Sequence, residues 1–311
     1  MRPRDRRLAK RLNDRLLSFD QNHTALHGIH NDQVRSVLVE QLLESIHRVN
    51  FVSLISQRHL SDRRADPTDE MFDPLKAAIL HQRGGNTDEA FWLIFLFVHF
   101  GKNSRGGWRY AREVYSRLGM GGRWDWASVS ADPGGFRAWL HAHQRDLTRA
   151  GIPGGFGNHR KYESLDAYSR TGTGAVVDSY VRWVNPPRTH EQLMNEVCAL
   201  AGNNPQEAFD QLYRSMRAVI RFGRMARVDY LAMIGKLRLA PIEPGFAYLQ
   251  NSTGPLDGAR LLVGGRRRIS TPTLEAVLVD LNGALKVGMQ VMEDALCNWQ
   301  KSPRKFVRFR G

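Results

Sequence analysis

Helical periodicity runs through almost the whole chain and constrains its fold more than any other feature. Apolar side chains recur at spacings of three and four residues in one segment after another, beginning with Val34, Val37, Leu38, Leu42 and Ile46. That spacing lines up one face of a helix. No segment alternates apolar and polar residues as a half-buried strand does, and there is no internal repeat. The sequence therefore predicts an all-α protein.

Capping residues and stop signals divide the periodic stretches into separate helices. Asn31 and Asp32 can cap the segment just described, and Thr87 can cap another. Pro74 suits the first turn of a helix, and Gly84 suits its end. Further helices are expected over residues 108–119, 134–151, 173–184, 189–202, 204–219, 221–237 and 272–300.

The apolar run "AFWLIFLFVHF", which ends at Phe100, marks the centre of the predicted core. It is apolar on nearly every side, as expected of a helix that is buried all round. A bilayer needs about 20 apolar residues in a row, roughly twice this run, so no membrane-spanning helix is expected. Cys198 and Cys297 lie in no paired motif, which favours a reducing compartment. We therefore expect a cytoplasmic protein.

The balance of charge indicates a polyanionic partner. The chain has 45 Lys and Arg residues against 31 Asp and Glu residues, a formal net charge of +14. An excess of this size favours nucleic acid over membrane. Basic residues cluster in "RPRDRRLAKRLNDR" near the N-terminus, in "GGRRR" at 264–268 and in "KSPRKFVRFRG" at the C-terminus. Each cluster is either a solvated tail or a set of phosphate contacts.

Composition and spacing also predict how the chain is organised. The expected parts are a basic N-terminal arm at 1–19, a helical domain at 20–265 and a C-terminal helix with a basic tail at 266–311. The glycine-rich segment at 151–157 is expected to be a loop, where two helical lobes meet around a basic cleft. Near the C-terminus, Gly283 and Gly288 are expected to soften one long helix without ending it. No obligate protein partner is implied.

Several common catalytic motifs are absent from the sequence. There is no P-loop, no dinucleotide fingerprint between a strand and a helix, and no nucleophile elbow around a serine. The spacing of His23, His27 and His30 would align them on a helix, but Gly28 disfavours that helix. Surface or capping roles are more common for such histidines than metal binding. We therefore expect neither a metal nor a cofactor.

A basic and aromatic loop follows the predicted core helix. In "HFGKNSRGGWRYARE", Lys102 and Arg105 can hold phosphates, and Trp108 can stack on a base. Gly106 and Gly107 would let backbone N–H groups approach a phosphate. The alternative is an ordinary connection between two helices.

A second segment has similar chemistry. In "GFGNHRKYES", a glycine turn is followed by polar, basic and aromatic residues, namely Asn158, His159, Arg160, Lys161 and Tyr162. Asparagine, histidine and tyrosine can read or stack on a base, whereas arginine and lysine hold phosphates. These residues are therefore predicted DNA contacts.

The segment "RFGRMARVDYLAMIGKL" at 221–237 raises the sharpest question, because it places a carboxylate on an apolar helix face. Spacings of three, four and seven from Asp229 reach Phe222, Met225, Ala226, Ala232 and Met233. A charge on such a face costs free energy unless it is paired or used in chemistry. Arg224 and Arg227, just upstream, are possible ion-pair partners of Asp229, and they are also predicted DNA contacts, as are Lys236 and Arg260. Lys236 lies on the same face, as a neutralising amine or a Schiff-base nucleophile.

The segment "YLQNSTGPLDGARLLVGG" holds the last candidate pair. Gly254 and Pro255 suit a turn, and Asp257 can cap the helix that follows, with Arg260 three residues later. A helix N-terminus directed at a phosphate is the alternative.

Taken in order, these segments resemble the family of alpha-glutamyl/putrescinyl thymine pyrophosphorylases. The likeness rests on "RRADPTDEMFDPLKAAILHQRGGNTDEAFWLIFLFVHFGKNSRGGWRYAREVYSRLG", "GGFGNHRKYESLDAYS", "FGRMARVDYLAMIGKL" and "GPLDGARLLVGG", and runs from about Asp20 to about Gly265. The resemblance implies a helical protein associated with DNA glycosylases and with hypermodified bases of phage DNA. Some members look like enzymes that install an amine or amino acid on a thymine-derived base. Others look like antiviral glycosylases that remove a modified base.

The resemblance and the loop chemistry together favour a DNA glycosylase. Such an enzyme flips its nucleotide out of the duplex, and a carboxylate beneath the sugar stabilises the charge that develops there. In helix-hairpin-helix glycosylases this carboxylate begins a helix after a glycine-containing hairpin. Gly223, Val228 and Asp229 stand in a loosely similar order, without a true G-x-G hairpin. The prediction is a multi-helix, glycosylase-like fold with Asp229 catalytic. Its substrate is double-stranded DNA carrying glucosylated hydroxymethylcytosine or a hypermodified thymine.

Two other functions stay open at this point. A transferase that displaces phosphate or pyrophosphate from an activated hydroxymethyl pyrimidine would alter the base and leave the glycosidic bond intact. A non-catalytic DNA-binding module would use Asp229 only as a buried ion-pair partner of Arg224 or Arg227.

Overall fold

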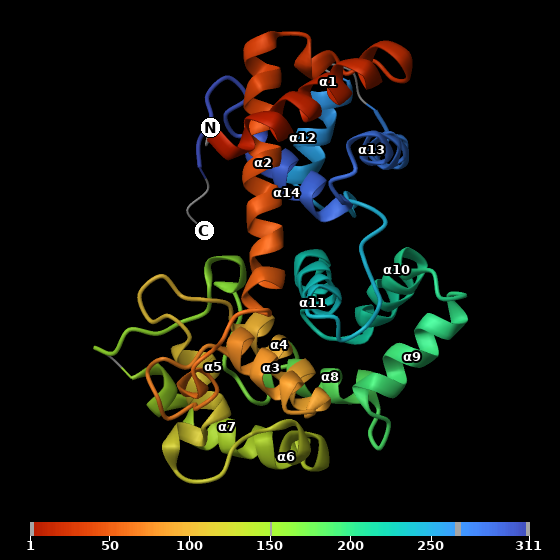
Figure 1. Cartoon of the computed structure of the whole chain (residues 1–311). Helices are drawn as coiled ribbons and strands as arrows, with labels where there is room; N and C mark the ends of the chain where they lie inside the picture. The colour runs from red at the N-terminus through yellow and green to blue at the C-terminus, as the bar shows by residue number, and fades with distance from the viewer. Residues whose placement is uncertain (1–2, 150, 265–268, 309–311) are drawn as a thin grey trace. The chain divides into compact units, whose positions relative to one another are not determined.

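The computed structural model describes residues 3–149, 151–264 and 269–308. Within these ranges the chain forms fourteen α-helices and no β-strand, which confirms the predicted all-α class (Figure 1). None of the described helices is long and apolar enough to cross a membrane. Short 3-10 helices lie at Pro3–Asp5, His27–Ile29, Asp62–Arg64, Arg117–Gly119, Asn158–Arg160 and Met216–Ala218.

The chain divides into two compact units. The first, called here the terminal unit, consists of Met1–Leu54 and Pro244–Gly311. The second, the central unit, consists of Ile55–Glu243. This division differs from the expected one. The glycine-rich segment at 151–157 is a loop, as predicted, but it lies inside the central unit rather than between two lobes.

The terminal unit is built from helices of both chain ends. They are α1 (Arg6–Asn22), α2 (Asp32–Ile55), α12 (Gly254–Val263), α13 (Thr271–Leu285) and α14 (Met289–Trp299). Leu12, Leu16 and Phe19 of α1 are at most 2% exposed and belong to the core of this unit. Residues 6–19 are therefore part of a packed amphipathic helix rather than a free arm, with the cations on its outer face.

The expected single helix at 272–300 is two helices, α13 and α14. Lys286 has a φ of 55° and Gly288 a φ of 91°, both in the left-handed region that an α-helix cannot contain. The Asn282 side chain accepts a hydrogen bond from the Gly288 N–H (2.8 Å) and stabilises the break. α13 thus ends at Leu285 with Lys286 as its C-cap, and Gly288 is the N-cap of α14, whereas Gly283 stays inside α13. The basic residues at 265–268 lie outside the described ranges.

The central unit surrounds one deeply buried helix, α4. Its helices are α3 (Pro74–Arg83), α4 (Thr87–Phe100), α5 (Arg109–Tyr115), α6 (Trp126–Ala131), α7 (Pro133–Thr148), α8 (Thr173–Val184), α9 (His190–Leu200), α10 (Pro205–Ser215) and α11 (Arg224–Lys236). Residues 91–96 of α4 are fully buried, as predicted from the apolar run. Its cap is Asn86, which accepts a hydrogen bond from the Glu89 N–H, whereas the predicted cap, Thr87, is the first helical residue.

A chain of buried hydrogen bonds fixes α11 against its neighbours. The Tyr230 hydroxyl of α11 lies 2.7 Å from the Tyr180 hydroxyl of α8, which lies 2.7 Å from Nε2 of His190. Nδ1 of His190 lies 2.7 Å from a carboxylate oxygen of Asp88 in the first turn of α4. Burial lowers the pKa of His190, which favours the neutral ring. Because Tyr230 directly follows Asp229, these bonds set the rotation of α11 and hence the side on which Asp229 lies.

Candidate nucleic-acid interface

The two loops predicted to contact DNA pack against each other in the central unit. They are called here the first loop, residues 101–108 between α4 and α5, and the second loop, residues 151–163 between α7 and α8. The side-chain amide of Asn103 donates a hydrogen bond to the carbonyl oxygen of Phe156 (3.3 Å). The structure therefore joins two segments that lie far apart in the sequence into one surface.

Glycines let the backbones of the two loops touch. A Cβ on Gly106 would lie 2.7 Å from Cα of Gly154, and a Cβ on Gly157 would lie 2.9 Å from the carbonyl carbon of Gly101. Neither distance leaves room for a methyl group, because real Cβ contacts are longer. Close loop packing thus explains Gly106 and Gly157, whereas Gly107 has open space around it and a positive φ of 58° that favours glycine.

The backbone N–H groups of Gly106 and Gly107 are already bonded, contrary to the prediction that they approach a phosphate. Oδ1 of Asn103 accepts hydrogen bonds from the N–H groups of Arg105 (2.9 Å) and Gly106 (2.8 Å). The Gly107 N–H donates to the Asn103 carbonyl oxygen (3.0 Å). The two glycines therefore have no N–H group left to donate to a phosphate.

Most of the predicted loop side chains are exposed. These are Lys102 and Arg105 of the first loop, and Asn158, His159, Lys161 and Tyr162 of the second. Tyr162 is 80% exposed, and Nζ of Lys161 lies 4.9 Å from the centre of its ring. An exposed ring beside a cation is suited to stacking on a base next to a phosphate.

Arg160 is different, because its guanidinium is held by the protein. It donates hydrogen bonds to the carbonyl oxygens of His99 (3.4 Å) and Arg221 (3.2 Å). It also lies 5.5 Å from the ring centre of Phe222 and 3.5 Å from a Glu163 oxygen. Arg160 therefore links the second loop to the segment that begins α11.

Asp229 lies within electrostatic reach of Arg160. Burial lowers the pKa of the Arg160 guanidinium, and the charges of Glu163 and Asp229 act in the opposite direction. The carboxylate predicted to be catalytic and the loop predicted to hold DNA are thus brought together.

Asp229 is half-buried, on the less buried side of α11. The buried side of this helix is formed by Ala226, Tyr230, Leu231 and Ile234. Met225, one turn before Asp229, is 44% exposed, and Met233 and Lys236 are half-buried on the same side. Of the apolar face counted from the sequence, Phe222, Ala226 and Ala232 are buried, and only Met225 and Met233 share the more open strip with Asp229. The helix is apolar on two sides, and the sequence alone does not say which side packs.

Arg227, a predicted DNA contact, is held by α10. Its guanidinium carbon lies 4.1 Å from the ring centre of Tyr213, and it donates a hydrogen bond to the Tyr213 carbonyl oxygen (2.9 Å). Burial lowers the pKa of Arg227. Arg224, in the first turn of α11, is half-buried. The Arg227 contacts fit a packing role better than a phosphate contact.

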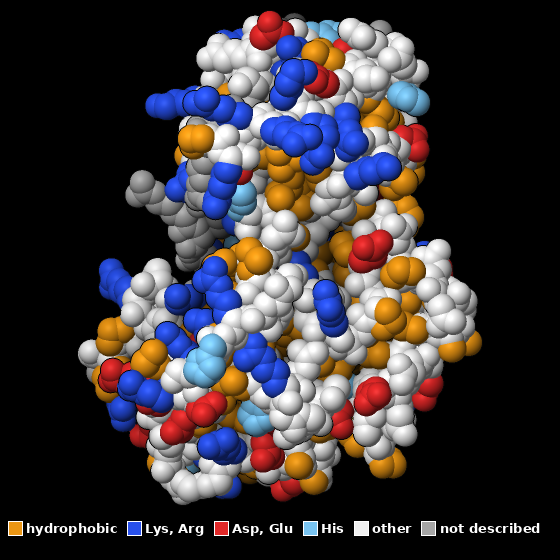
Figure 2. All heavy atoms as spheres, in the orientation of Figure 1, with side chains coloured by type: hydrophobic (Ala, Val, Ile, Leu, Met, Phe, Trp, Pro, Cys, Tyr) orange, Lys and Arg blue, Asp and Glu red, His pale blue; other side chains and the backbone are white. Residues whose placement is uncertain are grey.

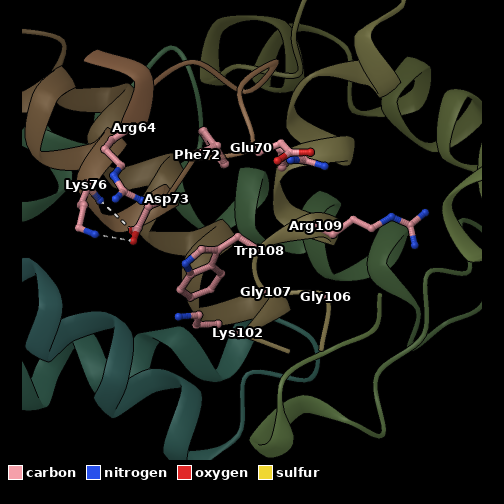
Figure 3. A pocket seen from close by; sticks show the side chains of 11 residues that line it. Arg64, Glu70, Phe72, Asp73, Lys76, Lys102, Gly106, Gly107, Trp108 and Arg109 are labelled. Atoms are coloured by element: carbon pink, nitrogen blue, oxygen red, sulfur yellow. Dashed lines mark hydrogen bonds and ion pairs between the residues drawn. The ribbon is translucent and has the colours of Figure 1, made fainter. Parts of the chain in front are cut away.

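The other side of the first loop lines a cavity of about 290 Å³ (Figure 3). Lys102 and Trp108, both predicted from the sequence, line it. Arg64, Lys76 and Arg112 also line it, and the sequence did not single them out as a group. Their segments are separated along the chain, and only the fold shows that they meet.

Asp257 and Arg260 lie in the terminal unit, on α12. The helix begins at Gly254, three residues before the predicted cap, so Asp257 lies inside its first turn. Its carboxylate is 3.6 Å from the Arg260 guanidinium. In the described residues, no group of three or more His, Cys, Asp or Glu side chains is placed to hold a metal ion.

Comparison with known families identifies the chain. A family model described as alpha-glutamyl/putrescinyl thymine pyrophosphorylase clade 3 matches residues 33–311. The chain belongs to this family. No curated protein and no solved structure matches it.

The region shared with the thymine pyrophosphorylase family contains every feature of the site. It includes both loops, the cavity beside Trp108, and the helix of Asp229. The α1 helix, with its exposed cations, precedes the matched region. The resemblance stated from the sequence is therefore confirmed at the level of the family.

Proposed function

We propose that the protein is a DNA glycosylase that excises a bulky modified pyrimidine from phage DNA, as an antiviral defence. One observation carries the proposal. Asp229 stands on the more open side of α11, and Arg160 joins that helix to loops whose exposed side chains are basic, polar and aromatic. Excision of a flipped base requires a catalytic carboxylate, side chains that hold the DNA phosphates and an aromatic ring that stacks on a base.

The chemistry assigns a role to each group. Lys102, Arg105 and Lys161 hold phosphates, and Tyr162 stacks on a base as the nucleotide leaves the duplex. As the bond between C1′ and the base nitrogen breaks, the base takes the electron pair and then a proton from solvent. Positive charge develops on the sugar, where the Asp229 carboxylate stabilises it. Water then adds to C1′: one of its protons stays in the new hydroxyl group, and the other passes to the Asp229 carboxylate and from there to solvent. An abasic site remains.

Substitution of the carboxylate tests this mechanism. Asp229→Asn keeps the size of the side chain and removes its charge, and should lower excision from modified phage DNA by at least about 100-fold. Abasic sites are counted after incubation with phage DNA that carries glucosylated hydroxymethylcytosine or a hypermodified thymine, and with unmodified DNA. Asp280→Asn, at an exposed position of α13, is the matched control and should excise normally.

Two outcomes of this experiment count against the proposal. Full excision by Asp229→Asn would show that another group is catalytic. Salt-sensitive DNA binding by the native protein, with no change to any of the DNAs, would indicate a non-catalytic DNA-binding module. In that case Asp229→Asn should bind DNA normally and be less stable, because it loses an ion-pair partner.

A second function is favoured by the cationic cavity. A transferase that displaces pyrophosphate from an activated hydroxymethyl pyrimidine needs a basic site for the leaving anion, and the family name denotes a pyrophosphorylase. Mass spectrometry of the reaction products separates the two activities. A glycosylase yields a free base and an abasic site, whereas a transferase yields a nucleoside of altered mass with its glycosidic bond intact.

A further inference from the structure

Glu163 is a nearly buried carboxylate that the mechanism proposed for Asp229 does not use. It is the last residue of the second loop, and its side chain is 6% exposed. An ionised carboxylate at such a position has lost most of its hydration, which costs free energy unless cations hold it. The structure supplies two cations, one from the loop itself and one from the segment that begins α11.

The first cation is Arg221, just before α11. Its Nε and Nη2 atoms each donate a hydrogen bond of 3.2 Å to a different oxygen of Glu163. Arg221 has a φ of 60°, in the left-handed region that residues other than glycine rarely adopt. Such a conformation persists where the surroundings hold it, and the two-fold contact with Glu163 is one of the contacts that do so.

The second cation is Arg160. Its Nη2 lies 3.5 Å from Oε1 of Glu163, and its carbonyl oxygen accepts a hydrogen bond from the Glu163 N–H (2.8 Å). The other guanidinium nitrogens donate to the carbonyl oxygens of His99 and Arg221. These contacts fix the orientation of a guanidinium whose charge interacts with Asp229.

Four charged groups therefore form one cluster around the start of α11. Arg160 and Arg221 are positive, and Glu163 and Asp229 are negative. The two signs balance only while Glu163 is ionised. Without Glu163, the two cations would outnumber the carboxylate of Asp229 and would offset the negative charge that a developing sugar cation requires.

We propose that Glu163 is a positioning residue for the excision reaction. It holds Arg160 and Arg221 and balances their charge, so that the Asp229 carboxylate can act on the sugar. Glu163 itself does not touch the substrate. The proposal rests on the proposed function and adds a residue to its mechanism. It also gives the second loop two tasks, because the loop that contacts DNA carries the carboxylate that balances the site.

Single-turnover excision from modified phage DNA separates the rate of base release from DNA affinity. Glu163→Gln keeps the size of the side chain and removes its charge, and its rate of base release at saturating protein should fall about tenfold. Its DNA affinity should stay equal or rise, because the protein has become more positive. A purely structural role would lower both quantities, since a distorted second loop would also contact DNA less well.

Restoring the balance of charge should restore the rate. The double variant Glu163→Gln and Arg221→Gln removes one charge of each sign, so its rate should return to within about threefold of the native rate. Glu163→Asp keeps the charge and should also retain most of the rate. The matched control is Glu196→Gln on α9, outside both loops. It removes the same charge from a pair with Arg188 (2.8 Å) in the same unit and should excise normally.

The results separate this proposal from the proposed function. A native rate in Glu163→Gln, or a loss that the added Arg221→Gln does not reverse, would overturn the role of Glu163 and leave that of Asp229 in place. A native protein that excises no base would remove the proposed function, and the role of Glu163 with it. Circular dichroism shows whether each variant is folded. If Glu163→Gln is not, the balanced double variant decides, because a rate far below the native one would overturn the proposal.

Discussion

At the scale of single residues, the buried carboxyl group of Glu89 should make the stability of the folded protein depend on pH. Its side chain is in the first turn of α4, and the residue is 3% exposed. It accepts hydrogen bonds from the Tyr115 hydroxyl (2.6 Å) and the Trp126 N–H (2.7 Å). Burial raises its pKa to about 7 in spite of these bonds. Because the folded pKa exceeds the unfolded value of about 4.3, stability should fall as pH rises from about 4.3 through 7.

Replacement of this carboxyl should remove that pH dependence. Glu89→Gln keeps an acceptor oxygen and cannot ionise, so its free energy of unfolding should change less between pH 5 and 8. The difference between native protein and variant should reach on the order of 3 kcal/mol across this window. Urea unfolding at a series of pH values measures it, with Asp280→Asn as the control. Parallel curves for native protein and Glu89→Gln would contradict the assignment.

The candidate site could be predicted from the sequence only in part. Lys102 and Tyr162 follow from local composition, because basic and aromatic residues beside glycines mark exposed loops. Lys76 and Arg112 could not be found this way, because their place beside Trp108 depends on which segments meet in the fold. The sequence places Asp229 on an apolar helix face, but only the fold shows that Asp229 lies on a half-exposed strip of it, with Ala226 and Ala232 buried on either side.

At the scale of elements, the glycine contacts between the two loops can be tested directly. Gly106→Ala would place a methyl group against the backbone of Gly154, and Gly157→Ala would do so against Gly101. Each change should lower the free energy of unfolding by about 1–3 kcal/mol and weaken DNA binding, because the loops must move apart. Denaturant unfolding and DNA titration measure the two effects. Gly283→Ala, with open space around it inside α13, should not destabilise the protein.

Helix positions were predictable where periodicity and caps agree. The bounds of α3 match the prediction, because Asp73 and Pro74 begin it and Gly84 follows its last residue. The break between α13 and α14 could not be predicted from periodicity, which continues across it. Left-handed backbone at Lys286 and Gly288 creates that break. The helix α1 was not predicted, because its many charged residues outnumber the apolar residues that form its regular apolar face.

At the scale of the whole molecule, the positive charge is carried by both units. The terminal unit exposes Arg7 and Arg11 on α1, and the central unit exposes Lys102, Arg105 and Lys161 of its two loops. Figure 2 shows Lys and Arg side chains spread over one face of the molecule. Nearby Lys10 is already paired, with its Nζ 2.6 Å from the Asp14 carboxylate. If DNA is the partner, unpaired cations on either unit can neutralise phosphates and release counterions on binding.

The salt dependence of DNA affinity should therefore show whether the cations of α1 contact phosphates. This helix precedes the region shared with the family. Replacing both Arg7 and Arg11 by glutamine should reduce the slope of log affinity against log salt by about 2, since each phosphate contact contributes about 0.9. Lys10→Gln should change the slope less, because Asp14 already balances that charge. Fluorescence anisotropy with a labelled duplex at several salt concentrations measures the slopes. An unchanged slope in the double variant would confine DNA binding to the other basic surfaces of the chain, and α1 would then serve the core of the terminal unit alone.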